Sequence, residues 1–277
     1  VFNSRTMLVF LVNPNVSKVT IWWNGSDTTT QTSLAYTNNY FTYDTNQRII
    51  NNGFLKMRID FSRQDNVESF KVISTMGSST ATAVLMRINQ DIAHYGDSEP
   101  MYSVLDGPVR AVLHHEVEWP SGGVSGCPNV YAHIVLTLPA NATYYTYQLR
   151  LMFIDSQQPR NITDLCPIRL SYSGGQPQTE NGTEVSTSTG LFYNFSASCW
   201  QHHWSQITSA SGTKGAGIMF RDAANQILYF FDAIAENKTG ALNVASDAIE
   251  LCPVTSMASV SFTYALDITW YGAVVTF

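Results

Sequence analysis

A run of ionisable residues, His114-His115-Glu116-Val117-Glu118, is the first candidate for chemistry in this sequence. On a β-strand, His114, Glu116 and Glu118 project to one side, and imidazole and carboxylate groups are ligands of transition metals. Alternate side chains of one strand lie about 6.6 to 7 Å apart, so three of them rarely close on a single ion. We therefore expect a solvent-facing or glycan-facing strand, with His115 packed in the core.

A second run, Cys199-Trp200-Gln201-His202-His203-Trp204, combines indole and imidazole rings with an amide. Such side chains can stack on a sugar and hydrogen-bond its hydroxyls, or bind a metal ion together with His114. A corner beside a disulfide, with its Trp side chains in the core, accounts for the same residues and is the interpretation we prefer. The alternative is a sugar or metal site that comprises His114, Glu116, Glu118, Trp200, His202, His203 and Trp204.

Catalytic motifs are absent from the sequence. It contains no GxSxG, no GxxxxGK[ST] and no helix-opening GxGxxG motif, and no Cys has the His context of a cysteine protease. Acid pairs such as Glu116 and Glu118 would suit a glycosidase only at a defined separation in space. We therefore assign no catalytic residue, no metal and no cofactor, and we favour a protein that is not an enzyme.

Asparagine sequons are unusually frequent. The sequence has about twice the number of Asn-x-Ser/Thr triplets that its composition would give by chance. Such triplets accept N-linked glycans in secreted proteins, although several of these would also suit turns. The seven candidate glycosylation sites are Asn15, Asn24, Asn141, Asn161, Asn181, Asn194 and Asn237.

Four cysteines, Cys127, Cys166, Cys199 and Cys252, lie in the second half of the chain. They lack the close CxxC pairs of a zinc site, so two disulfides in an oxidising compartment are the preferred interpretation over four buried thiols. Three connectivities are possible. Pairing of sequence neighbours, Cys127–Cys166 and Cys199–Cys252, is slightly favoured.

The composition is that of a folded protein with a weakly charged surface. Of 277 residues, 44% are hydrophobic but only 13% are charged, and the net charge is −6. This acidic balance argues against a nucleic-acid partner, and no apolar run is long enough to span a membrane. Polarity comes instead from 54 Ser and Thr and 19 Asn, against 5 Lys. The chain begins at Val1 without Met, which is typical of a mature or trimmed protein.

Alternation of apolar and polar residues predicts β-strands along the whole chain. The longest are Pro108–Trp119 and Tyr144–Ile154, and only Asp91–Tyr95 and Asp222–Asn225 suggest a turn of helix. The fold class we predict is all-β, a large antiparallel sandwich. One domain over 1–277 is preferred; the alternative is two sandwich domains, 1–173 and 190–277, joined by a Ser/Thr/Gly-rich loop. The other predicted strands are 6–12, 18–23, 54–61, 69–74, 83–88, 130–138, 168–173, 190–196, 217–221, 226–232, 248–251, 259–266 and 268–276.

Two segments resemble known families. Asp106-Gly107-Pro108-Val109-Arg110-Ala111-Val112 resembles a strand entry of galactose-mutarotase-like supersandwich domains, which implies a sandwich of this size. The C-terminal third, with Gly217-Ile218-Met219-Phe220-Arg221-Asp222, Thr239-Gly240-Ala241-Leu242 and Asp267-Ile268-Thr269-Trp270-Tyr271-Gly272-Ala273-Val274-Val275, is similar to uncharacterised archaeal surface proteins. That resemblance implies an archaeal envelope location.

These observations predict a glycosylated extracellular or cell-surface protein with a structural or adhesive role, such as a subunit of an archaeal filament or envelope layer. Its partners would be other copies of itself, envelope proteins and N-linked glycans. Strands near the chain ends, Thr6–Val12 and Ile268–Thr276, could be donated to a neighbouring subunit. The alternative function is a carbohydrate-binding or carbohydrate-active domain that uses a sheet face lined by aromatic and His side chains.

Overall fold

The computed structural model describes residues 41–44, 47–60, 63–64, 67–68, 71–89, 91–92, 101–106, 109–119, 130–154, 159–163, 165–181, 184–187, 189–191, 204–221, 241–252 and 260–277. All regular elements in this part of the chain are β-strands, which confirms the all-β prediction. Several predicted features lie outside the described residues, namely the strands at 6–12, 18–23 and 226–232, the sequons at Asn15, Asn24, Asn194 and Asn237, and Cys127, Cys199, Trp200, His202 and His203. Nor do the described residues include a helix that could cross a membrane.

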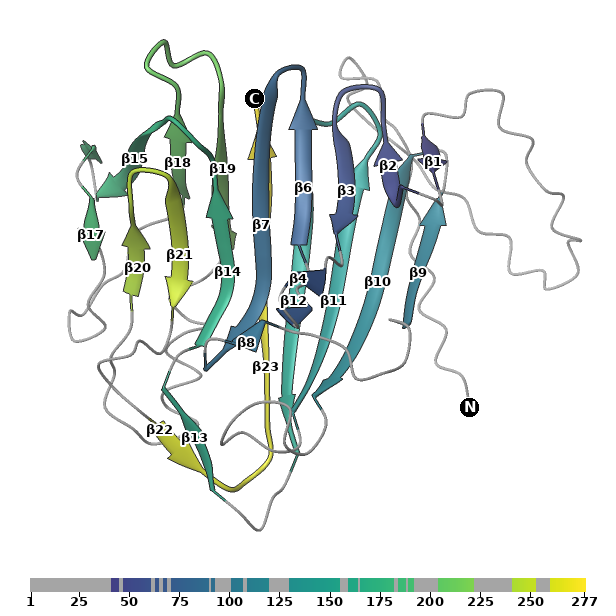
Figure 1. Ribbon diagram of the computed structural model, residues 1–277, viewed down its shortest axis with the longest axis vertical. Helices are drawn as coiled ribbons and strands as arrows, with labels where there is room; N and C mark the ends of the chain where they lie inside the picture. The colour runs from purple at the N-terminus through teal and green to yellow at the C-terminus, as the bar shows by residue number, and fades with distance from the viewer. Residues whose placement is uncertain are drawn as a thin grey trace, which may run out of the picture.

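Two large antiparallel sheets form the sandwich, with their long strands running side by side in Figure 1. One sheet has ten strands, in the order β1 (Thr42–Asp44), β2 (Ile49–Asn51), β3 (Lys56–Asp60), β6 (Lys71–Met76), β7 (Ser79–Ile88), β14 (Leu165–Ser171), β21 (Ala248–Cys252), β20 (Ala241–Val244) and β17 (Gly190–Leu191), with β8 (Asp91–Ile92) also paired to β7.

The other sheet has nine strands, in the order β16 (Glu184–Ser186), β15 (Gln176–Asn181), β18 (Trp204–Thr208), β19 (Gly215–Arg221), β23 (Leu266–Thr276), β12 (Tyr144–Phe153), β11 (Val130–Pro139), β10 (Arg110–Trp119) and β9 (Met101–Asp106). Two small ribbons pair β13 (Arg160–Ile162) with β22 (Val260–Phe262) and β4 (Arg63–Gln64) with β5 (Val67–Glu68). Both large sheets contain strands from before residue 173 and from after residue 190.

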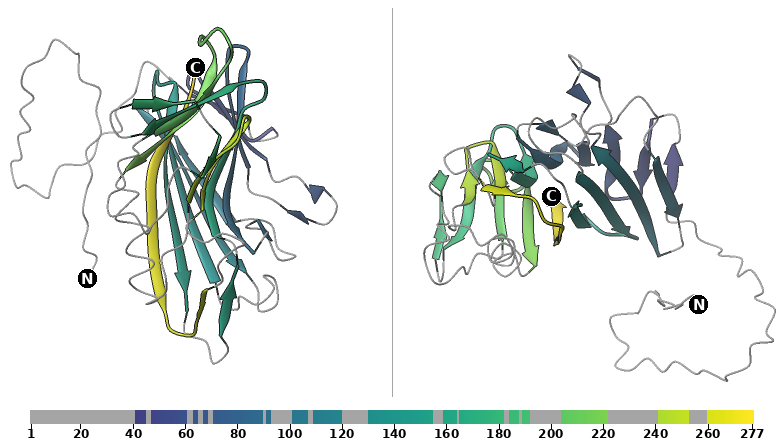
Figure 2. Two further views of the ribbon diagram at one scale, coloured as in Figure 1. Left: turned by 90° about the vertical axis from the view of Figure 1, so that its left-hand side faces the viewer. Right: turned by 90° about the horizontal axis from the view of Figure 1, so that it is seen from below.

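The core lies between the two large sheets, which appear as two layers when viewed from the side (Figure 2). Alternation places one face of the long strands in this core, with a shift in β7, where the neighbours Leu85 and Met86 are both buried. In β11, for example, Ile134 and Leu136 are fully buried, whereas their neighbours Val135 and Thr137 are partly exposed. The opposite face of the nine-stranded sheet, which we call the outer face, therefore carries the alternate residues.

The C-terminal strand β23 lies in the middle of the nine-stranded sheet. It pairs with β12 on one side, from Leu266 to Val275, and with β19 on the other, from Tyr271 to Thr276. Both edges of this strand are thus used within the chain's own sheet over Tyr271 to Val275, and these residues offer no free edge to a neighbouring subunit.

Two local expectations are corrected by the structure. The Ser/Thr/Gly-rich segment 173–189 is not a plain loop, because it contains β15 and β16. The helical turn predicted at Asp91–Tyr95 is wrong at its start, since Asp91 and Ile92 form β8 and fold back on β7. Asn89, with a φ of 50°, makes that reversal in the left-handed region that Asn tolerates.

Candidate functional site

Strands β10 and β11 bring two histidines and a glutamate together on the outer face. The antiparallel register sets Glu116 directly opposite His133. His114 lies two residues from Glu116 on the same side of β10, and therefore diagonally across from His133. Opposite and diagonal neighbours of an antiparallel pair are within reach of long side chains, so this register is sufficient to gather all three.

The three side chains converge on one point. One ligand atom from each of His114, Glu116 and His133 lies within 4.8 Å of the others. The two Nε2 atoms of the imidazoles face one another, and the rings are perpendicular, with centroids 4.2 Å apart. Glu116 places a carboxylate oxygen 3.9 Å from Nε2 of His114. The His114 and Glu116 side chains are 38% and 58% exposed, so the cluster opens to solvent.

The surroundings of His133 favour its neutral form, although the carboxylate of Glu116 acts in the opposite direction. The pKa of His133 is lowered from the ordinary value, chiefly because burial disfavours the imidazolium and also because His114 is close. Arg150, directly across on β12, adds to this effect. The charge of Arg150 is itself balanced by Asp267, whose carboxylate accepts bonds from Nε at 2.9 and 3.1 Å. A neutral imidazole has the free lone pair that a metal ion or a hydroxyl donor requires.

The structure places the predicted site residues in different ways. His114 and Glu116 share the cluster, and His115 is fully buried on the core face, as expected. Glu118 lies further along β10, opposite Tyr131, and its side chain is not described. Trp204 begins β18 and is partly buried.

Trp204 and His114 do not form one site. Four strands, β19, β23, β12 and β11, lie between their strands in the sheet order. At about 4.8 Å per strand the two residues are roughly 24 Å apart. The aromatic and His residues of the predicted sugar or metal site that are described are thus divided between distant strands.

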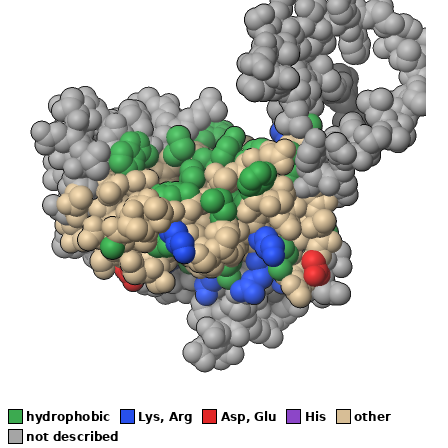
Figure 3. Space-filling model, turned by 90° about the horizontal axis from the view of Figure 1, so that it is seen from above, with side chains coloured by type: hydrophobic (Ala, Val, Ile, Leu, Met, Phe, Trp, Pro, Cys, Tyr) green, Lys and Arg blue, Asp and Glu red, His purple; other side chains and the backbone are tan. Residues whose placement is uncertain are grey.

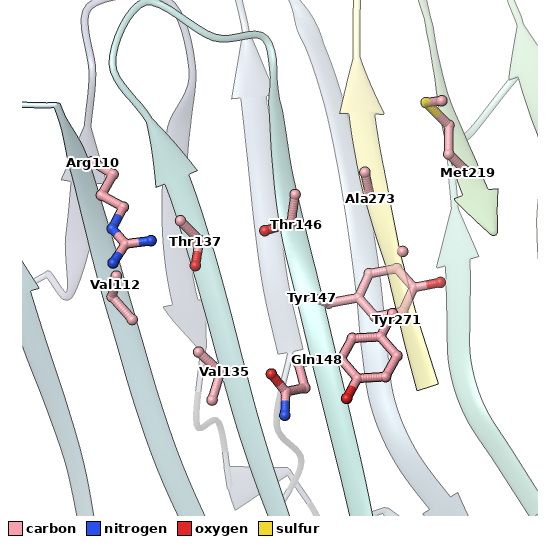
Figure 4. A pocket seen from close by; sticks show the side chains of 11 residues that line it. Arg110, Val112, Val135, Thr137, Thr146, Tyr147, Gln148, Met219, Tyr271 and Ala273 are labelled. Carbon is pink, nitrogen blue, oxygen red and sulfur yellow. The ribbon is translucent and has the colours of Figure 1, made fainter. Parts of the chain in front are cut away.

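A second feature of the outer face is a groove of about 730 Å³ that crosses five strands. Figure 4 shows its side chains, with Arg110 at one end and Met219 at the other. Its lining consists of Arg110, Val112, Val135, Thr137, Thr146, Tyr147, Gln148, Met219, Tyr271, Gly272 and Ala273. The volume falls in the usual range of small-ligand sites.

The groove combines apolar surface with hydrogen-bonding groups. Met219 and Tyr271 are 54% and 38% exposed, which is unusual for large hydrophobic side chains. Thr137, Thr146 and Gln148 place hydroxyls and an amide beside them on β11 and β12. An exposed phenol ring beside such groups can stack on one face of a ligand while the polar side chains bond its edge.

Gly272 shapes the floor of this groove. A Cβ atom at this position would lie 2.3 Å from both the hydroxyl of Tyr147 and the carbonyl oxygen of Met219. Tyr147 sits directly opposite Gly272 in the register, and burial raises the pKa of its phenol. The missing side chain thus makes room for the Tyr147 ring.

The groove and the histidine cluster are neighbours. Tyr271, Gln148 and Val135 line the groove and form one row across β23, β12 and β11, and His114 is the next residue of that row on β10. His133 and the groove were not singled out by the sequence. His133 could have been found by pairing the two long strands from their facing ends, Trp119 with Val130, which sets Glu116 against His133.

Comparison with known proteins gives little further information. The chain matches no protein-family model and no curated protein. Among solved structures it is similar to two variants of a Glycoside Hydrolase Family 97 enzyme from Pseudoalteromonas sp. strain K8, one of them in complex with panose. Each alignment covers 86% of this chain and 35% of the enzyme, at 10% identity and a TM-score of 0.38. The chain therefore spans about a third of the length of those enzymes, and similarity at this level carries no argument about its activity.

Proposed function

We propose that this protein is a carbohydrate-binding domain that holds a glycan in the groove on the outer face of the nine-stranded sheet. The observation that carries the proposal is the exposed Tyr271 ring beside Gln148, in a groove of the size of a small-ligand site. Sugars present apolar C–H faces and hydroxyl edges. A flat aromatic ring flanked by amide and hydroxyl groups matches both of these surfaces.

The charges near the groove favour a neutral or weakly acidic glycan. Among the described residues that line the groove, Arg110 is the one with a charge. It can donate several hydrogen bonds to hydroxyl or carboxylate oxygens at one end of the groove. The rest of the lining is apolar or uncharged, so binding would depend on stacking and neutral hydrogen bonds and would be insensitive to salt.

The test is a glycan array, followed by calorimetry with the best ligand. Tyr271→Ala and Gln148→Ala should each weaken binding by about tenfold or more, since each removes at least one hydrogen bond or stacking contact. Phe54→Ala is the matched control, because Phe54 is 55% exposed but lies on the turn between β2 and β3 of the other sheet. Absence of any glycan ligand, or binding that survives Tyr271→Ala, would refute the proposal.

A structural or adhesive role at an archaeal cell surface is the second candidate. It is supported by the sequons, since Asn141 and Asn161 are both exposed on the described surface and accessible to a glycosyltransferase. Low charge agrees with it: Figure 3 shows isolated charged side chains among hydrophobic and neutral ones at the end of the sandwich near the C-terminus. Electron microscopy of native material would reveal a repeating assembly, and peptide mass spectrometry would reveal glycans at Asn141 and Asn161. Unmodified, monomeric native protein would rule this candidate out.

A further inference from the structure

We propose that His114, Glu116 and His133 bind one divalent transition-metal ion, with Zn²⁺ as the best match. The proposal does not depend on glycan binding. It rests on the convergence of three ligand atoms, each within 4.8 Å of the other two, on a rigid pair of strands. A metal ion placed between atoms at such separations reaches all three after small rotations of the side chains.

The backbone beneath the cluster is well fixed. β10 and β11 pair without interruption over ten residues. β11 is also paired with β12 on its other side, where Arg150 lies opposite His133. Core residues on the opposite face, such as Leu113 and Ile134, are buried and hold both strands against the other sheet. The ligands are therefore presented by sheet rather than by loops, which limits the cost of ordering them when an ion binds.

The donor set selects the kind of ion. Two imidazole nitrogens and one carboxylate oxygen suit Zn²⁺ and its neighbours in the first transition row, whereas Ca²⁺ and Mg²⁺ prefer oxygen ligands alone. Three protein ligands leave a coordination position open. Because the Glu116 side chain is 58% exposed, that position faces solvent and can take water or an exogenous ligand.

The charges around the cluster permit a cation. Arg150 is a positively charged neighbour, directly across from His133 on β12. Its guanidinium is bonded to both oxygens of Asp267 on β23. This pairing offsets the repulsion that a free guanidinium would exert on an ion next to His133.

Calorimetric titration of chelator-treated, untagged protein with ZnCl₂ tests the proposal, and Co²⁺ absorption reports the ligand set. We expect one ion per chain, and at least about a 100-fold weaker affinity in His133→Ala and Glu116→Gln, since loss of a group that only hydrogen-bonds a metal ligand already costs about 10- to 100-fold. Asp247→Asn is the matched control, because it removes the same carboxylate charge at an exposed turn between β20 and β21 of the other sheet. Its affinity should remain within about threefold of wild type.

Two results would overturn the proposal. One is the absence of stoichiometric binding of Zn²⁺ or Co²⁺ by the wild-type chain. The other is binding that persists in His133→Ala or is lost equally in Asp247→Asn. Thermal unfolding in the presence of chelator should be the same for all variants, because the substituted side chains are at the surface. This measurement separates loss of the ligand from loss of the fold.

Discussion

Ser74 and Thr276 form a hydrogen bond inside the sandwich, with their hydroxyl oxygens 2.7 Å apart. Ser74 belongs to β6 of the ten-stranded sheet and Thr276 to β23 of the nine-stranded sheet. Both side chains are buried, and 202 residues separate them in the sequence. The two layers are thus joined by a polar contact between buried side chains.

Breaking this contact from one side should destabilise the protein. Ser74→Ala leaves the Thr276 hydroxyl buried without its partner and should lower the free energy of unfolding by about 1 to 3 kcal/mol. Ser74→Ala combined with Thr276→Val should cost less than the sum of the single changes. Thr75→Ala is the control, since Thr75 bonds Thr80 at the surface. Urea unfolding gives the free energy of unfolding of Ser74→Ala, Thr276→Val, the double variant and the control. Losses in the two single variants that add up to the loss in the double variant would contradict the prediction.

Asn52 should be among the most sensitive polar residues. Its side-chain nitrogen donates to the carbonyls of Pro139 and Ala142 at 2.7 and 2.9 Å, and its oxygen accepts from the amides of Phe54 and Leu55 at 3.0 and 2.7 Å. Asn52→Ala removes four bonds from a residue that is 1% exposed, and should cost about 2 to 4 kcal/mol.

Two comparisons sharpen this prediction. Asn52→Asp should be at least as damaging, because a carboxylate cannot donate to the two carbonyls and is buried as a charge. Asn51→Ala, at the partly exposed neighbour whose side chain accepts from the amide of Gly53, should cost less than about 1 kcal/mol. Urea unfolding measures the free energy of unfolding of these variants. Equal losses of that free energy in Asn51→Ala and Asn52→Ala would contradict the prediction.

Tyr145 should make the protein sensitive to alkali. Burial, with a smaller contribution from nearby Tyr147, raises the pKa of its phenol far above the ordinary value. The unfolded chain releases this proton near pH 10, but the folded chain retains it. Stability that is present below about pH 10 is therefore lost as the pH rises further.

Substitution of Tyr145 separates this effect from packing. The hydroxyl is buried and has no hydrogen-bond partner among the described residues, so Tyr145→Phe should leave stability at neutral pH unchanged or slightly higher. In Tyr145→Phe the urea midpoint should fall less steeply above about pH 10 than in the wild type. Tyr144→Phe, at a 40% exposed neighbour, should leave the fall as it is. A wild-type midpoint that does not fall in alkali would contradict this account.

The strand register bears on the expected disulfides. β14 and β21 pair with Ile168 opposite Leu251, so Cys252 comes opposite Pro167, one residue from Cys166. Residues one register step apart on paired strands have Cα atoms within the separation of a disulfide. We therefore predict Cys166–Cys252, and hence Cys127–Cys199, in place of the pairing of sequence neighbours. Non-reducing peptide mapping distinguishes these connectivities, and a Cys127–Cys166 peptide would contradict the prediction.

Sequence patterns predicted the long strands well, because one face of each is buried and the other is wet. The 144–153 strand shows this alternation along its whole length, and the 110–119 strand shows it from Ala111 to Glu116. The strand at 176–181 was missed because its pairing is polar: Gln178 bonds Gln206 and Thr179 bonds Ser205, each at 2.7 Å. A segment of such polar residues resembles a loop sequence when its partner strand is unknown.

Two of the three residues of the candidate metal site could be identified from the sequence, and the third could not. His114 and Glu116 stand out because they alternate on one strand, but a metal site needs ligands that converge. The third ligand, His133, is 17 residues beyond Glu116 and becomes a neighbour only through the β10–β11 register. Composition and motif spacing do not contain that register. The groove is also a property of five strands at once, and none of them carries a sequence signal for it.

The central place of β23 has a consequence for the order in which the protein can be made. Without this strand, the nine-stranded sheet separates into β16–β15–β18–β19 and β12–β11–β10–β9, which have no other described pairing between them. The groove draws residues from both halves. During synthesis the sheet therefore cannot close until residues 266–276 have left the ribosome. Until then the nascent chain exposes two unsatisfied strand edges, a state in which chaperones would shield it from aggregation.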